Sequence, residues 1–133
     1  MTWIISTENM RQEDGQRVGG KGYALALLAK GGFAIPKTLC VTSETYQAYV
    51  RRTGLRERIL LELNRKSFKD MRWEEIWDCA TRIRNMFLRK PIPDDISGQL
   101  KQVIHAAFHD KAVVVRSSAP EEDDAMSSFA GLH

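Results

Sequence analysis

Residues 18–36 read VGGKGYALALLAKGGFAIP, and this stretch decides how the N-terminal part of the chain is expected to fold. Its middle carries apolar residues at i, i+3 and i+4, the spacing of one face of a helix: Leu25, Leu28 and Ala29. The pair Gly31-Gly32 follows, and glycine readily takes the left-handed conformation that ends helices. The stretch therefore predicts a helix over residues 21–30 that is entered through a glycine loop.

The rest of the chain alternates short strand patterns with longer helical ones. Strands are expected at residues 3–5 and 38–41, and a buried strand at the continuous apolar run of residues 112–115. Helices are expected after a cap at Thr42 or Ser43, and over the apolar faces that begin at Leu55, Trp73 and Ile96. Residues 7–17 are polar and are expected to form a loop. Together these elements predict an α+β fold with several helices and a small sheet.

The composition is that of a folded globular protein. Of the 133 residues, 43% are hydrophobic and 28% are charged, which is close to the average for folded domains. No apolar run approaches the roughly 20 residues that span a bilayer, and the first residues lack the pattern of a secretory signal. Cys40 and Cys79 have no metal-ligand spacing and are interpreted as buried free thiols of a reducing compartment. We therefore expect a cytoplasmic protein that does not contact a membrane.

Basic residues gather in residues 51–72, although the net charge is only +3. A basic stretch can bind nucleic acid, but few aromatic residues interleave with these arginines, so a solvated helix face is the preferred interpretation and no nucleic-acid partner is expected.

His105 and His109 are four residues apart on one predicted helix and could share a metal ion. No third ligand is placed to help them, so no metal site is predicted.

Lys21 is the first candidate for ligand binding. Gly19, Gly20 and Gly22 surround it and would let the backbone approach a ligand, while the following helix directs N–H groups to the same place. A lysine at a helix N-terminus is unfavourable by itself, and an anion would relieve it. The alternative is a simple turn with a solvated lysine. Residues 15–21 also match G-x-x-x-x-G-K, but Gly22 replaces the expected Ser or Thr and no hydrophobic strand leads in, so a P-loop is rejected.

Arg116 is the second candidate, because it directly follows the apolar run of residues 112–115. A guanidinium group there can hold phosphate oxygens through two parallel hydrogen bonds, and a salt bridge to Glu121 or Glu122 is the alternative. The third candidate is a segment of small residues whose backbone N–H groups could fold over phosphates. Its residues are Ser128, Phe129, Ala130 and Gly131.

Two of these segments together resemble one family. GGKG at residues 19–22, followed by GFAIP at 32–36, resembles the opening of the phosphoenolpyruvate synthase and pyruvate phosphate dikinase family. VRSSAPEED at residues 115–123, followed by SFAG at 128–131, resembles a second motif of that family, in the same order and spacing. Rifampicin phosphotransferases share this ATP-binding half. About residues 51–110 show only compatible helices, and Tyr23 stands where a small residue is usual.

The resemblance implies an ATP-grasp nucleotide-binding domain, of which residues 1–133 would form one partial, N-terminal portion. It implies that Lys21 and Arg116 contact the phosphates of ATP, that the glycines around Lys21 support them, and that residues 128–131 cover the phosphates. It also implies ATP and, in the complete enzyme, Mg²⁺ as cofactors. The family passes phosphate from ATP through a phosphohistidine on another domain to pyruvate or to another acceptor.

None of the three histidines of this chain matches the phosphocarrier motif. We therefore expect no catalytic residue and no metal ligand within the chain, and we expect the fragment alone to be inactive. Two alternatives remain open. The chain could be a nucleotide-binding or regulatory module without catalysis, or it could be the same domain of a rifampicin phosphotransferase-like enzyme.

Overall fold

The computed structural model describes residues 2–120, 123–124 and 127–128. Contacts between Cα atoms divide the chain into two compact units. Unit 1 consists of Met1–Tyr46 with Ile96–His133, and unit 2 consists of Gln47–Asp95. Each unit is described below by itself.

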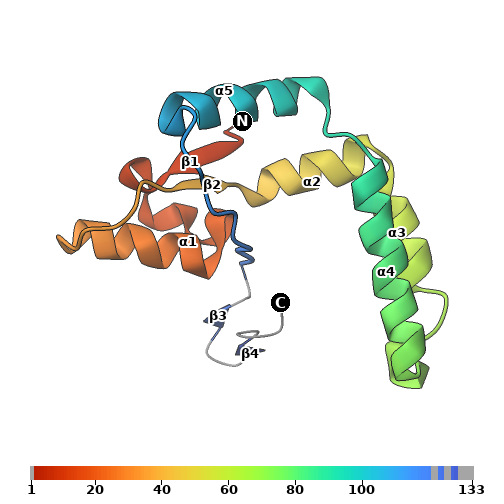
Figure 1. Cartoon of the computed structure of the whole chain (residues 1–133). Helices are drawn as coiled ribbons and strands as arrows, with labels where there is room; N and C mark the ends of the chain where they lie inside the picture. The colour runs from red at the N-terminus through yellow and green to blue at the C-terminus, as the bar shows by residue number, and fades with distance from the viewer. Residues whose placement is uncertain (1, 121–122, 125–126, 129–133) are drawn as a thin grey trace. The chain divides into compact units, whose positions relative to one another are not determined.

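The described helices and strands form an α+β fold, as predicted (Figure 1). The elements in chain order are β1 (Ile4–Ser6), the 3₁₀ turns η1 (Thr7–Asn9) and η2 (Gln12–Asp14), α1 (Gly15–Lys30), β2 (Leu39–Val41), α2 (Ser43–Arg52), α3 (Leu55–Leu63), the 3₁₀ turn η3 (Phe68–Asp70), α4 (Trp73–Arg89), α5 (Asp94–Phe108), β3 (Asp123–Asp124) and β4 (Ser127–Ser128).

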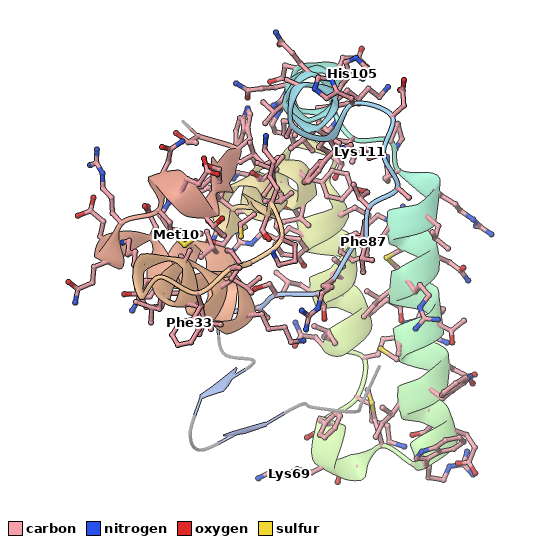
Figure 2. The ribbon with its side chains drawn as sticks, turned by 60° about the vertical axis from the view of Figure 1, so that its left-hand side comes forward. Met10, Phe33, Lys69, Phe87, His105 and Lys111 are labelled. Carbon is pink, nitrogen blue, oxygen red and sulfur yellow. The ribbon has the colours of Figure 1, made fainter. Side chains whose placement is uncertain are left out.

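Unit 1 is built on an antiparallel pair of strands with α1 packed against it. β1 pairs with β2 in the register Ile5↔Cys40. The buried core cluster takes Ile5 from β1, Cys40 from β2, and Val18 and Ala26 from α1. Met10, labelled in Figure 2, completes it at 3% exposure. Burial of such side chains contributes about 1.5–3 kcal/mol each for the larger ones, so the unit depends on the contact between α1 and the two strands.

The end of α1 confirms the stop that Gly31-Gly32 predicts. Gly32 has φ +85°, the left-handed conformation that glycine adopts without steric cost. The N–H of Gly31 donates to the carbonyl of Leu27 at 2.9 Å, and the N–H of Phe33 donates to the carbonyl of Leu28 at 3.1 Å. These bonds satisfy carbonyls that the helix end would otherwise leave unpaired.

The start of α2 is anchored by two threonines to the residues that immediately precede β1. The Thr42 hydroxyl donates to the carbonyl of Thr2 at 3.0 Å, and the Thr45 hydroxyl donates to the carbonyl of Trp3 at 2.7 Å. Thr42 and Thr45 are both buried, at 1% and 5% exposure. Because a buried hydroxyl needs a partner, these bonds fix where the chain leaves β2 and enters the helix.

Unit 2 contains α3 and α4, which lie side by side (Figure 1). Leu55 is fully buried, and Glu62 is buried with its carboxylate accepting a hydrogen bond from the Arg82 Nε at 2.9 Å. The Tyr49 hydroxyl donates to the carbonyl of Lys90 at 2.8 Å, next to the C-terminal end of α4. The long helix predicted from Trp73 is therefore confirmed, with its end held by a tyrosine from α2.

Within the part of the chain that the structure describes, four of the eight basic residues in the stretch of residues 51–72 form ion pairs, namely Arg52, Arg65, Lys66 and Arg72. Arg52 makes two hydrogen bonds to the Asp95 carboxylate, at 2.9 and 2.8 Å. Lys66 pairs with Glu75 at 3.0 Å. These partners agree with the interpretation of a solvated helix face.

The loop predicted over residues 7–17 is wrong. Residues 7–17 do not form a simple loop, because η1 and η2 occupy much of the segment and α1 begins already at Gly15. The backbone N–H of Arg11 donates to the Asp14 carboxylate at 2.9 Å, and this bond closes the turn that leads into the helix. A sequence that is polar all along gives no periodic signal for such turns.

The apolar run of residues 112–115 is not a buried strand. It has no regular secondary structure, and Val114 and Val115 are 86% and 92% exposed. A strand forms only where a neighbouring strand pairs with it, and in the part of the chain that the structure describes β1 pairs with β2 and β3 with β4. The apolar composition favours burial, but the three valines of this run are exposed in the structure.

Among the described residues, no helix combines the length and the apolar character needed to cross a bilayer. Both cysteines are buried and free, as predicted.

Candidate functional site

Helix α1 is broken at Gly19, within the predicted motif. Gly19 has φ 79° and ψ 168°, which are not helical values, so Gly15–Lys30 consists of two helical segments that meet at this residue. Such dihedral angles lie in a region that is populated almost entirely by glycine. The predicted entry through a glycine loop is thus wrong, because residues 15–18 and Gly20 are helical and only Gly19 departs from the helix. A single glycine suffices to redirect the chain.

The break in α1 is in contact with the second predicted motif. The Ser118 hydroxyl donates a hydrogen bond to the backbone carbonyl of Val18 at 2.6 Å, across 100 residues of sequence. A Cβ atom placed on Gly19 would lie 2.5 Å from the Ser118 Oγ and 2.9 Å from the carbonyl oxygen of Ala119. Position 19 therefore requires glycine for two reasons, its backbone conformation and the close approach of residues 118–119.

Lys21 lies two residues after the break, in the first turn of the second helical segment, and is partly exposed. It takes part in a polar or electrostatic interaction in this structure. The first N–H groups of a helix point outward from its start, so Lys21 adds a full positive charge at a place where N–H groups can donate hydrogen bonds to an anion.

Gly22, on the opposite side of Lys21 from the break, is buried. A Cβ atom at this position would lie 2.8 Å from the Cys40 Sγ. Gly22 therefore lets α1 approach β2 closely, and its role in this structure is packing within the core of unit 1.

Arg116 lies two residues before Ser118, in an exposed segment without regular secondary structure. The hydrogen bond of Ser118 to Val18 brings this segment to the start of the second part of α1. The structure thus places Lys21 and Arg116 near the same contact, within unit 1. The alternative partners of Arg116, Glu121 and Glu122, lie outside the described residues.

The third predicted segment is described only in part. β3 pairs antiparallel with β4 in the register Asp123↔Ser128, and β3 lies close to α1 (Figure 1). Ser128 is thus the end of a short hairpin next to the helix that carries Lys21. Phe129, Ala130 and Gly131 lie outside the described residues, and their proposed place over the phosphates remains a prediction.

A charged network supports the first segment of α1. The Arg17 side chain donates to the Asp14 carboxylate at 2.7 Å and to the Glu44 carboxylate at 2.6 Å. The backbone N–H of Arg11 lowers the pKa of Asp14, burial opposes this change, and Arg17 adds to the lowering. Burial acts to raise the pKa of Glu44, but hydrogen bonds from its own backbone N–H and from Arg17 outweigh burial, so the pKa of Glu44 is lowered as well. Both carboxylates therefore remain charged and hold the helix start in place.

Sequence reasoning assigned no role to Ser118, Arg17 or Asp14. The opposite charges of Asp14 and Arg17 at i and i+3 are a recognisable signal of a helix start. Ser118 belongs to a motif that was identified, but only its contact with Val18 shows what its hydroxyl does.

A polar hollow of about 360 Å³ lies in unit 1, and its walls include Ser6, Arg11 and Arg17. Neither Lys21 nor Arg116 lines it, so the candidate phosphate site is separate from this hollow.

His105 and His109 are exposed, with ring centroids 6.1 Å apart. Within the part of the chain that the structure describes, no group of three or more metal-ligating side chains occurs.

Comparison with known proteins identifies a family that the sequence of this chain matches. Residues 15–133 match the family described as pyruvate phosphate dikinase, AMP/ATP-binding domain. The chain belongs to this family. The resemblance inferred from the two motifs is therefore confirmed, and the matched residues include both the broken helix and the segment that carries Arg116.

The relatives of this AMP/ATP-binding domain are much longer proteins. The phosphoenolpyruvate synthase of Neisseria meningitidis is 34% identical over 97% of this chain and 17% of its own length. The rifampicin phosphotransferase of Streptomyces sviceus is 31% identical over 97% of this chain and 15% of its own length, and that of Bacillus subtilis is 32% identical over 86% and 13%. The chain thus spans less than a fifth of the length of these relatives.

Proposed function

We propose that this chain forms part of the ATP site of a phosphotransferase, with Lys21 and Arg116 as the residues that bind the phosphates of ATP. The observation that carries the proposal is the hydrogen bond between Ser118 and Val18, because it brings the two cationic segments to one place in unit 1. The description of the family as an AMP/ATP-binding domain supports the nucleotide. Residues 128–131 complete the proposed site.

The chemistry of phosphoryl transfer suits this assignment. Little covalent participation by the protein is needed, and positioning and charge neutralisation supply most of the catalysis. Lys21 offers a compact point charge, and Arg116 offers a planar fork that can hold two phosphate oxygens. Backbone N–H groups at the start of the second segment of α1 and around Ser128 would share the remaining oxygens.

Our proposal extends to the longer protein that such a domain serves. Phosphate would pass from ATP through a phosphohistidine on another domain to pyruvate, within an ATP-grasp type of nucleotide site. Mg²⁺ would assist in the complete enzyme with ligands from elsewhere. The two buried free thiols agree with a cytoplasmic location, since thiols persist in a reducing compartment.

A second acceptor deserves equal testing, because a rifampicin phosphotransferase is nearly as similar to this chain as a phosphoenolpyruvate synthase is. In that case phosphate would pass to a hydroxyl group of the drug. A protein that joins this chain to its remaining domains would distinguish the two by forming a phosphorylated product with pyruvate or with rifampicin.

Isothermal titration of ATP into the 133-residue chain tests the nucleotide site. Lys21→Ala and Arg116→Ala should each weaken binding by about 10- to 100-fold, the scale of a charge-assisted hydrogen bond. Lys30→Ala, in the last turn of α1, and Arg89→Ala, at the end of α4, remove exposed cations of the same types and should leave the affinity unchanged. Equal affinity in all four variants would refute the assignment.

The chain alone should not consume ATP, since none of its three histidines fits the phosphocarrier motif. Phosphorus NMR of the chain with ATP, Mg²⁺ and pyruvate should show no AMP and no phosphoenolpyruvate. Formation of either product by the purified chain would show that a catalytic group lies within it.

A further inference from the structure

We propose that Ser118 is a positioning residue, whose hydroxyl fixes the segment that carries Arg116 onto the break in α1 and thereby sets the separation between Arg116 and Lys21. This inference rests on the proposed function, because it assigns a role toward the phosphates that those two cations are proposed to bind.

The contact itself is short and well defined. The Ser118 Oγ lies 2.6 Å from the carbonyl oxygen of Val18, at the short end of the range for a hydroxyl donor. Val18 is only 2% exposed, so its carbonyl belongs to a rigid part of the core rather than to a loose loop. Because the Ser118 hydroxyl is bonded to this carbonyl, the hydrogen bond holds the segment around Ser118 in a defined position on the core of unit 1.

Gly19 makes this contact possible. Any side chain at position 19 would overlap with the Ser118 Oγ, because a Cβ atom there would lie only 2.5 Å from it. The absence of a side chain lets residues 118–119 lie directly against the helix break. Gly19 thus leaves the space for residues 118–119, and Ser118 makes the hydrogen bond that holds them there.

Both cations lie only a few residues from this contact. Lys21 lies three residues after Val18, whose carbonyl accepts the bond, and Arg116 lies two residues before Ser118. Since each residue of an extended chain spans at most about 3.6 Å, the Cα atom of Lys21 lies within about 11 Å of that of Val18, and the Cα atom of Arg116 within about 7 Å of that of Ser118. Both side chains are long enough to reach one ligand from such positions, provided that the contact holds.

Measurements of affinity in a double-mutant cycle test the positioning role. Ser118→Ala should weaken binding of ATP and of inorganic tripolyphosphate by the chain about fivefold, the scale of one hydrogen bond. In the Arg116→Ala background, Ser118→Ala should have almost no further effect, because the cation that Ser118 positions is already absent. A residue that merely stabilises the fold would weaken binding equally in both backgrounds. Ser97→Ala, which removes a hydroxyl from α5 in the same unit, is the matched control.

Hydrogen exchange of the same variants separates the contact from the ATP site. Amides of residues 18–22 and 116–119 should exchange faster in Ser118→Ala than in the original chain, and those in Ser97→Ala should not. Unchanged exchange in Ser118→Ala would overturn the contact as a structural link. Faster exchange with unchanged affinity, or with equal losses in both backgrounds, would overturn the positioning role. Failure of the original chain to bind either ATP or tripolyphosphate would instead refute the proposed function, and the positioning role with it.

Discussion

Gly19 combines two constraints that can be measured separately. Replacing it with alanine should lower the free energy of unfolding by at least about 1–3 kcal/mol for the backbone conformation alone. The clash with Ser118 and with the carbonyl of Ala119 should add to this loss, because a backbone atom cannot rotate away. Urea denaturation, followed by circular dichroism, gives the value.

Gly32→Ala is the matched control for this prediction. Gly32 has a similar positive φ of 85°, but an added Cβ atom would meet nothing within 4 Å. A larger loss for Gly19→Ala than for Gly32→Ala therefore reflects the contact of Gly19 with residues 118–119 together with its ψ of 168°, which is populated almost entirely by glycine. Equal losses of stability would show that Ser118 does not lie against the helix break.

Asp14 should make the stability of the chain depend on pH in acid. Its pKa is lowered in the folded state, by the N–H of Arg11 and also by Arg17, so it stabilises the fold at pH values above its unfolded pKa of about 3.9. This contribution is lost as the pH falls through the lowered folded pKa. Asp14→Asn should therefore show a shallower loss of stability between about pH 5 and pH 2.

The neighbouring Glu13 provides the comparison, because its side chain is 75% exposed. Glu13→Gln should leave the slope of stability against pH close to that of the original chain. If Asp14→Asn keeps the original slope, the hydrogen bonds of Asp14 do not stabilise the helix start.

At the level of single residues, the sequence indicated Lys21 and Arg116 but not what brings them together. Charge and glycine content are visible in the sequence, and they indicated two segments that the structure brings into contact. The bond between Ser118 and Val18 joins positions 100 residues apart, and no local pattern encodes such a contact.

The packing of α1 on β2 depends on a glycine inside a helix. Gly22→Ala should lower the free energy of unfolding by about 1–3 kcal/mol, since the new methyl group would lie 2.8 Å from the Cys40 Sγ and the core would have to move. Adding Cys40→Ala should recover part of the loss, because the sulfur atom that meets the methyl group is removed. Thermal or urea unfolding of the two single variants and the double variant measures this coupling.

An additive result would contradict the prediction. If the loss in the double variant equals the sum of the two single losses, Gly22 and Cys40 do not compete for the same space. Gly98→Ala on α5, where an added Cβ atom meets nothing within 4 Å, controls for the intrinsic helix preference of alanine over glycine.

Elements whose apolar residues recur at a regular helical spacing were predicted well, and elements without such a spacing were not. The helices α4 and α5 carry apolar faces over many residues, and both lie where the sequence indicated. The turns η1 and η2 depend on individual hydrogen bonds, such as that from Arg11 to Asp14, and leave no periodic trace. The run of residues 112–115 has strand-like residues, but pairing depends on a neighbour rather than on composition.

At the scale of the whole chain, we expect the run of three exposed valines to promote association between chains. Val113, Val114 and Val115 are 49%, 86% and 92% exposed, and an unpaired apolar β-branched segment is a template for association. Val114→Lys should raise the concentration at which the chain remains monomeric while leaving the free energy of unfolding within about 0.5 kcal/mol of its original value. Sedimentation over a concentration series, with urea denaturation alongside, checks both parts.

Val41→Lys serves as the comparison, since Val41 is also exposed, at 53%, but already lies in β2 and pairs with β1. It should change association much less than Val114→Lys does. Should both variants associate equally, the apolar run of residues 112–115 is not the segment through which chains meet.

The hydrogen bond between Ser118 and Val18 also closes a very long loop of chain. All of Gln47–Asp95 lies within the 100 residues that it spans. The entropy lost on closing a loop grows only with the logarithm of its length, so that doubling the loop costs about 0.6 kcal/mol. Insertions in the connection between α3 and α4, which leave the helices intact, should therefore scarcely affect how readily the two cationic segments meet, and the chain can lengthen there while the proposed phosphate site stays the same.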